Sequence, residues 1–459
     1  ASYIPGQGVG ALNQTGFAGY NATTLSGTNL ATDNVRITAT GTVPSGGLTI
    51  NSLVVNGNIA LNFASGTDVL NLVAGGLIGS NNNQAIGATL DSGRLTAGGT
   101  ASSGVVDFYL YNRANTLTLN SRLVDNPNGA AVRMILTASG GAMTLPNVLN
   151  SYTGGTVLNG GTFNLNVAGV SAGQASIPAG GLTINAATVT MTNSAGQIAA
   201  NNAVTMNGGS TLTLFGNNTL SELTLNNIGG TASAPSVNTG GSLAVTSGRV
   251  SASSQNPSAT NTITGRVDFA ATPAVVSVQP LGVEGRDAGP LQPSLILTGV
   301  SGSGGVTKSG DGVLQINYLG TFGPILDVTG GGIRIGAANV GSRLARLNLA
   351  TGTRLDLAGV AGQFGGLSGS GNVFSSGVAS TLTVGLLGED TTFSGGINRF
   401  NDVTPAGVNV AKIGTGTLTL TGAMNTTGTM TVSQGGVRLS GATAGLFSGF
   451  TVANGGALV

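Results

Sequence analysis

The sequence predicts an all-β protein built as a solenoid. From Asn34 onward, short apolar and threonine-rich stretches alternate with Gly/Asn/Ser turns, a pattern typical of strands in an all-β fold. The segment 304–336 also aligns without a gap with a second copy 104 residues later. Self-similarity at a fixed period is the signature of a solenoid, in which each repeat packs on the next.

The two copies agree at the positions that define the repeat. The only two lysines of the chain, Lys308 and Lys412, occupy the same point in it. The other equivalent pairs are Leu314 with Leu418, Gly332 with Gly436 and Arg334 with Arg438. A looser third copy spans 147–166 and lacks the lysine. At roughly 20–25 residues per coil, the chain would form about twenty coils.

Composition supports strands and excludes several kinds of protein. Glycine accounts for 80 of 459 residues, yet 40% of residues are hydrophobic and only 7% are charged, the reverse of a disordered chain. The net charge of +1 offers no basic surface for nucleic acid. Without cysteine or histidine, the chain cannot form disulfides, thiolate sites or histidine–metal sites. We therefore expect no cofactor and no bound metal.

The chain divides into two parts. Residues 1–33 are rich in glycine, asparagine and threonine, and we expect them to form an N-terminal cap or lead-in segment, whereas 34–459 form the solenoid. No apolar run approaches the length of a membrane-spanning helix. We expect a signal peptide to have been removed, and either a longer chain or another molecule to supply the coil that follows Val459.

Residues 104–138 form the least repetitive coils and are decorated with aromatic and charged side chains. The period of two places Asp107, Tyr109 and Tyr111 on one face of a strand and Phe108 and Leu110 on the other. Two outward tyrosines could stack on a sugar ring. The alternative is a purely structural aromatic pair that covers a neighbouring coil, and cross-strand aromatic packing of that kind is common.

A second candidate contact surface is the segment 279–294. It contains three prolines and the charged residues Glu284, Arg286 and Asp287, and we predict a loop that projects from the solenoid, because proline is disfavoured in central strands. Such a loop is a plausible contact site, and a solvated insertion without a partner is the alternative.

The repeat residues resemble a known family. The order Lys-x-Gly-x-Gly-x-Leu-x-Leu, found as KIGTGTLTL, is followed by TGTMTVSQGGVRL, and KSGDGVLQI begins the looser copy. This arrangement resembles the autotransporter-associated β-strand repeat. The resemblance implies a right-handed parallel β-helix that is exported to the surface of a Gram-negative-type bacterium as a passenger.

Some parallel β-helices degrade polysaccharides, so an enzyme is the main alternative. Glycoside hydrolysis usually needs two carboxylates about 5–9.5 Å apart. The chain has 15 acidic residues, and the adjacent Glu389 and Asp390 would face opposite sides of a strand. We therefore expect no catalytic residues.

The expected function is that of a non-enzymatic extracellular structural or adhesive protein, one form of which is a subunit of a self-assembling surface fibre. Its partners would be other copies of itself, or a glycan or protein of a cell surface. The alternative is a carbohydrate-binding or polysaccharide-degrading β-helix that uses Asp107, Tyr109 and Tyr111.

Overall fold

The structure is a computed structural model. It describes all residues except 1, 5–7, 11, 18, 81, 114, 140, 148, 172, 229–232, 270–272, 339, 342, 399–405 and 442–446. The chain forms two compact units. Unit 1 comprises Ala1–Met206 and Ser210–Gly216, and unit 2 comprises Asn207–Gly209 and Asn217–Val459.

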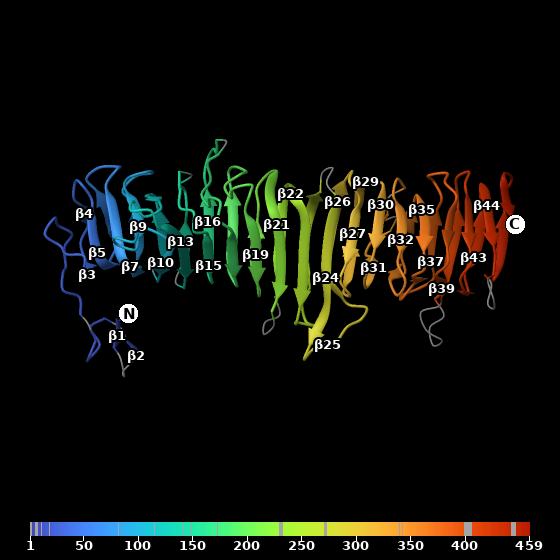
Figure 1. The fold of residues 1–459 in the computed structure, drawn as a ribbon, viewed down its shortest axis with the longest axis horizontal. Coiled ribbons are helices and arrows are strands. Elements are labelled where there is room, and N and C mark those ends of the chain that lie inside the picture. The colour runs from blue at the N-terminus through green and yellow to red at the C-terminus, as the bar shows by residue number, and fades with distance from the viewer. Residues whose placement is uncertain are drawn as a thin grey trace. The chain divides into compact units, whose positions relative to one another are not determined.

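The predicted fold class is confirmed. Both units are all-β parallel solenoids, and the described residues contain strands and turns but no helix. The described coils number about 16, fewer than the twenty expected, because several coils are longer than 25 residues. A hydrogen bond between neighbouring coils links Thr116 to Asn83, 33 residues apart, whereas another links Asn348 to Asp327, 21 residues apart. Figure 1 shows the successive strands of each unit lying side by side in the same direction.

Unit 1 has three rows of paired strands. The first row contains β3 (Asn34–Ile37), β5 (Leu48–Asn56), β7 (Val69–Ser80), β10 (Val105–Asn112), β13 (Ala131–Ala138), β15 (Thr156–Asn159), β17 (Leu182–Asn185) and β19 (Ala203–Asn207). The second contains β4 (Gly41–Val43), β6 (Ala60–Phe63), β8 (Asn83–Ile86), β11 (Thr116–Leu119), β14 (Ala142–Thr144), β16 (Thr162–Asn166), β18 (Thr188–Thr192) and β20 (Thr211–Thr213). The third joins the first halves of β5 and β7 to β9 (Arg94–Ala97) and β12 (Arg122–Leu123).

Unit 2 also has three rows. The first contains β21 (Asn218–Asn227), β22 (Ser236–Ser254), β24 (Ala274–Val283), β27 (Val306–Ser309), β30 (Ile325–Val328), β32 (Arg346–Leu349), β35 (Gly366–Gly369), β38 (Thr391–Phe393), β41 (Thr417–Leu420), β44 (Gly435–Leu439) and β46 (Gly456–Leu458). The second joins β22 to β23 (Asn261–Asp268), β26 (Pro293–Gly302), β28 (Val313–Ile316), β31 (Gly332–Ile335), β33 (Arg354–Asp356), β36 (Asn372–Phe374), β39 (Gly396–Asn398) and β42 (Met424–Asn425), with β29 (Leu319–Phe322) also paired to β26. The third contains β34 (Gly362–Phe364), β37 (Ser380–Val384), β40 (Val408–Lys412), β43 (Thr429–Val432) and β45 (Gly449–Val452).

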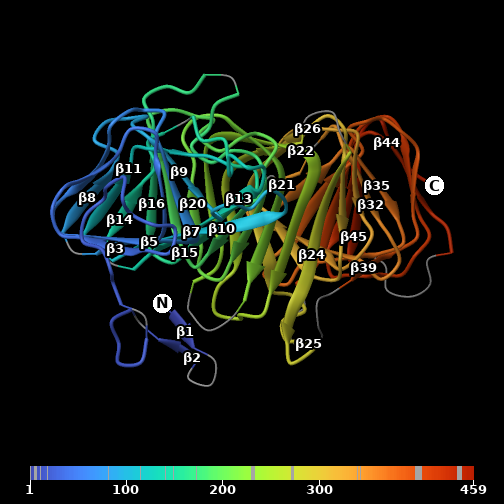
Figure 2. The same ribbon diagram turned by 60° about the vertical axis from the view of Figure 1, so that its left-hand side comes forward.

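The N-terminal segment differs from the coils. Strands β1 (Ser2–Ile4) and β2 (Gly8–Gly10) pair with each other in antiparallel register, and Figure 2 shows this pair apart from the stack of unit 1. Further along, Ala22 forms a parallel bridge with Val35 of β3, and Asn21 donates a hydrogen bond to the carboxylate of Asp33. Residues 21 and 22 therefore lie along the first strand of the stack.

The alternation of residues decides which side chains enter the core. In β13, Val132, Met134 and Leu136 are buried, while Arg133 and Ile135 between them face outward. Each unit therefore has a narrow interior of Leu, Val and Ile, and each coil covers the interior of its neighbour. The least repetitive stretch, 104–138, follows the same rule: β10 and β13 pair over all eight residues of each strand.

The expectation that proline excludes a strand from 279–294 is wrong at Pro280 and Pro293. Pro280 lies inside β24, and Pro293 begins β26. The register between β22 and β24 shifts after the pair Ala252 and Val278, so that Pro280 lies at a β-bulge. Proline is tolerated at bulges and at the first residue of a strand because its missing N–H is not needed there.

The two repeat lysines are buried in unit 2, and their ammonium groups bind backbone carbonyl oxygens. Lys308 is 0% exposed, and its Nζ donates to the carbonyl oxygens of Gly310, Gly312 at 2.7 Å and Gly330 at 2.8 Å. Lys412 is 1% exposed and donates in the same way to Ile413 at 2.8 Å, Gly414 at 2.7 Å and Gln434 at 3.3 Å. In each case one acceptor is 22 residues further on, in the next coil. The lysine therefore ties one coil to the next.

The glycines of the Lys-x-Gly-x-Gly motif form the corner of the coil at which the lysine is bound. Gly310 and Gly414 have φ of 74° and 72°, which side chains rarely adopt. A Cβ on Gly312 would meet the carbonyl oxygen of Gln279, and one on Gly416 would meet that of Glu389. In each of its two copies, the motif therefore combines a lysine with a corner at which neighbouring coils approach closely.

Candidate functional site

The tyrosine face predicted on 106–112 is present on β10 in unit 1. Phe108 and Leu110 are buried at 0% and 1% exposure, whereas Tyr109 and Tyr111 are 46% and 39% exposed. The period of two therefore places the side chains as expected. Tyr109 lies directly opposite Gly76 of β7 and Ile135 of β13, so that its flanks are a glycine and an aliphatic side chain.

Hydrogen bonds fix the polar atoms of this face. Arg133 lies opposite Asp107, and its guanidinium donates to both carboxylate oxygens at 2.7 and 3.1 Å. The hydroxyl of Tyr109 donates to Asp107 at 2.8 Å, and the hydroxyl of Tyr111 accepts from Ser139 at 2.7 Å. The two rings are thus held at their tips while their faces stay partly exposed.

These contacts determine the charge of Asp107. The hydrogen bond from Arg133 lowers the pKa of Asp107, and the one from Tyr109 lowers it further, while partial burial acts in the opposite direction. The carboxylate therefore stays ionised at neutral pH. Such a group is poorly suited to be the general acid of glycoside hydrolysis, which needs a raised pKa.

The second predicted contact surface contains a β-hairpin in unit 2. Strand β25 (Arg286–Asp287) pairs in antiparallel register with the end of β24, Val283 opposite Arg286. Between them, Glu284 and Gly285 have φ of 50° and 76°. Two central residues with positive φ form a type I′ turn, whose twist suits a two-residue hairpin. This turn was not predicted from the sequence, in which Gly285 was the only local signal for it. In Figure 2 the hairpin extends beyond the coils of unit 2.

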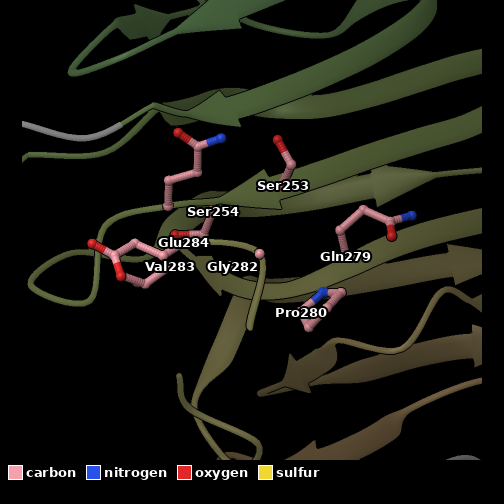
Figure 3. Close-up of a pocket in the computed structure, with 9 residues that line it drawn as sticks. Ser253, Ser254, Gln279, Pro280, Gly282, Val283 and Glu284 are labelled. Atoms are coloured by element: carbon pink, nitrogen blue, oxygen red, sulfur yellow. The ribbon is translucent and has the colours of Figure 1, made fainter. Parts of the chain in front are cut away.

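The charged residues of this hairpin do not converge on one point. Glu284, Arg286 and Asp287 are exposed, and Asp287 accepts a hydrogen bond from the N–H of Gly289 at 3.1 Å. A hollow of about 570 Å³ lies at the base of the hairpin, and Glu284 is the only ionisable residue that lines it. Figure 3 shows the side chain of Glu284 on one side of this hollow and that of Gln279 on the other.

The remainder of the segment is held against the coils. Arg354 of β33 donates to the carbonyl oxygen of Pro290, and Arg334 of β31 donates to that of Leu291 at 3.5 Å. Gln292 donates to the carbonyl oxygen of Pro257 at 2.8 Å. Only the hairpin end of 279–294 therefore projects. Its other end covers two arginines that would otherwise face solvent.

The adjacent acids Glu389 and Asp390 have separate structural roles. Glu389 forms an ion pair with Arg346, and Asp390 accepts a hydrogen bond from the N–H of Thr417 at 2.7 Å. Asp356, which is 3% exposed, accepts hydrogen bonds from the N–H groups of Ala358 and Ser376 at 2.8 and 2.9 Å. These carboxylates hold turns and neighbouring coils in place. Within the described ranges, no group of three or more acidic side chains could hold a metal ion.

Sequence reasoning missed a hollow of about 390 Å³ in unit 1. It is lined by Arg36, Asn56, Ser80 and Arg113. These residues are spread over 78 positions of the sequence, and only the pairing of unequal coils brings them together. The one available signal was the alternation in the stretch from Asn34 to Ile37, which turns Arg36 outward between buried Val35 and Ile37.

Comparisons with family models, with curated proteins and with solved structures find no match to this chain. Within the described ranges, no helix is long and apolar enough to span a membrane. The resemblance to the autotransporter-associated repeat therefore rests on the repeat residues themselves, and the lysine corners give those residues a physical role.

Proposed function

We propose that the chain is a non-enzymatic structural and adhesive protein of the outer surface of a Gram-negative-type bacterium, of the autotransporter-passenger type. The observation that carries this proposal is how its ionisable groups are used. Lys308, Lys412, Arg354 and Asp356 bind backbone groups, and Glu389 pairs with an arginine. In the part of the chain that the structure describes, these groups hold coils in place.

The outward faces of the coils support a structural role. Asn185 donates to Asn159 of the preceding coil at 2.8 Å, and Thr192 donates to Asn166 at 3.2 Å. Rows of uncharged side chains that form hydrogen bonds from one coil to the next stabilise a stack, as they do in other stacked β structures. Faces with few charges also allow copies to approach one another, and a fibre of several chains is one form of this proposal.

Purified protein immobilised on beads tests the adhesive role. We expect attachment to bacterial or host cell surfaces, or to purified surface glycans, without release of new reducing ends. Beads that attach to none of these surfaces would contradict the proposal, as would turnover of any polysaccharide. Electron microscopy at high protein concentration tests the fibre form, which would be excluded by particles that remain separate.

A polysaccharide-degrading β-helix is the second candidate, and the exposed Tyr109 and Tyr111 beside Asp107 favour it. A screen of acidic and neutral polysaccharides decides between the two. Cleavage that is lost in Asp107→Asn would support the enzyme, and no turnover of any substrate would exclude it.

A further inference from the structure

We infer that the hollow lined by Arg36, Asn56, Ser80 and Arg113 in unit 1 binds the acidic groups of an anionic polysaccharide. The inference rests on the proposed adhesive function and names the class of its target. The four residues belong to neighbouring strands of one row. Arg36 lies in β3, Asn56 ends β5, Ser80 ends β7, and Arg113 follows the last residue of β10. Three strand-to-strand steps of about 4.8 Å give an extent of roughly 14 Å along the row.

The two arginines are available to a ligand. Both are exposed, and neither forms an ion pair in the part of the chain that the structure describes. By contrast, Arg122 and Arg133 in the same unit each bind a carboxylate through two nitrogen atoms. The guanidinium of Arg36 lies 5.9 Å from the centre of the Tyr20 ring, a cation–π contact that orients it without using its N–H groups.

The chemistry of the hollow suits carboxylate or sulfate groups on sugars. A guanidinium presents a planar fork of donors that matches these anions. Between the arginines, the hydroxyl of Ser80 donates to the side-chain oxygen of Asn56 at 3.0 Å. The amide hydrogens of Asn56 can donate hydrogen bonds to sugar hydroxyls, and the hydroxyl oxygen of Ser80 can accept one.

Tyr111 extends the site along β10. It precedes Arg113 by two residues, so that both lie on the outward face. Tyr111 is 39% exposed, and the hydrogen bond from Ser139 holds the hydroxyl of its ring in place. A sugar that stacks on this ring would bring its acidic group toward Arg113. Nucleic acid is disfavoured, because two arginines on a chain of net charge +1 neutralise too few phosphates for stable binding.

Equilibrium binding to the purified chain tests the inference with four probes: polygalacturonate, heparin, neutral dextran and single-stranded DNA. We expect binding to polygalacturonate, to heparin or to both, weakened by salt, and no binding to dextran. The double variant Arg36→Gln/Arg113→Gln should lose about tenfold or more in affinity for the acidic glycan. Tyr111→Ala should weaken the same binding without altering its salt dependence.

The control is Arg438→Gln, which removes an exposed arginine of unit 2 and should bind as the unchanged chain does. Thermal melting of every variant shows that its coils remain folded. A double variant with unchanged affinity, or DNA bound as tightly as the acidic glycans, would overturn the inference. If the beads attach to cell surfaces while the acidic glycans do not bind, the inference fails and the adhesive function stands. If the beads attach to nothing, both fail.

Discussion

Two sets of cations, one in each unit, differ in what they bind. In unit 2, Lys308, Lys412 and Arg354 donate to carbonyl oxygens of their own chain, and a connecting segment covers Arg354. In unit 1, Arg36 and Arg113 are exposed beside a row of strands and line an open hollow. An arginine is therefore structural where a segment of the chain covers it, as at Arg354, and is available to a ligand where it lines an open hollow, as at Arg36 and Arg113.

This difference shows how a solenoid can separate stability from recognition. The coils are held by contacts between neighbours, so a face without a covering loop is not needed for the stack. Changes at the covered cations of unit 2 should therefore alter stability, whereas changes at the hollow of unit 1 should alter binding alone.

The largest effect is expected from Lys308→Met. The variant leaves three carbonyl oxygens at a buried corner without their donor, which should lower the free energy of unfolding by about 2 kcal/mol. Denaturant unfolding followed by circular dichroism measures the change. The matched variant Lys412→Met should cost less, because one of its three contacts is longer, at 3.3 Å. Equal stability of Lys308→Met and the unchanged chain would show that the corner does not depend on the ammonium group.

The next effect concerns pH. The pKa of Lys308 is lowered to about 7, chiefly by burial; Asp311 acts in the opposite direction, and Arg354 contributes a smaller lowering. The ordinary value is 10.5. Between these two values the folded chain binds fewer protons than the unfolded chain, so the free energy of unfolding should rise with pH.

The rise should be at most about 1.4 kcal/mol per pH unit, and less where the carbonyl acceptors favour the charged form. Unfolding midpoints measured from pH 7 to pH 9.5 test it, with Lys308→Met as the control that should lose this dependence. The prediction would be contradicted if the unfolding midpoint of the unchanged chain fell from pH 7 to pH 9.5 while that of Lys308→Met did not.

A smaller effect is expected from Arg334→Gln/Arg354→Gln. Without these donors the segment 288–292 should leave the surface of the coils, at a cost of about 1 kcal/mol or less because both side chains are partly exposed. Limited proteolysis should then cut the chain near Leu291. Arg438→Gln is the control and should leave the cleavage pattern unchanged. Equal resistance of the double variant would show that other contacts, such as that of Gln292, hold the segment.

The smallest effect is expected from Asp107→Asn in unit 1. The ion pair with Arg133 is partly exposed, so its loss should change the free energy of unfolding by less than about 1 kcal/mol. Binding of acidic glycan at the hollow should not weaken. A loss of stability as large as that of Lys308→Met would remove the distinction between the two units.

The sequence was enough for the fold class and for the outward face of β10, because both depend on local periodicity. It also placed the two lysines at one point of the repeat, a hint that their role is structural. It could not show their burial, because a lysine in a threonine-rich strand usually faces solvent. Only the close approach of coils at Gly312 and Gly416 provides the carbonyl oxygens.

The candidate sites were harder to predict because they depend on coil length. Asn83 and Thr116 are neighbours at a separation of 33 residues, and Asp327 and Asn348 at 21, so no fixed period aligns Arg36 with Arg113. The segment 279–294 was expected to project as a whole. Its prolines suggested this, but the carbonyl oxygens of Pro290 and Leu291 accept hydrogen bonds from arginines that lie much later in the sequence.

The comparison between the units requires that successive coils pair in parallel, and disulfide formation tests this most directly. The chain has no cysteine, so an engineered pair of cysteines has no other thiol in the chain with which to form a disulfide. Ile135 lies opposite Val157, and Thr137 opposite Asn159. Cysteines at either pair would be about 4.8 Å apart between Cα atoms, within the range for a disulfide.

We predict that both pairs close under mild oxidation, whereas Thr137→Cys/Asn185→Cys, which spans two coil steps, stays reduced. Closure of Ile135→Cys/Asn159→Cys and Thr137→Cys/Val157→Cys in place of the matched pairs would indicate antiparallel strands and would contradict the account.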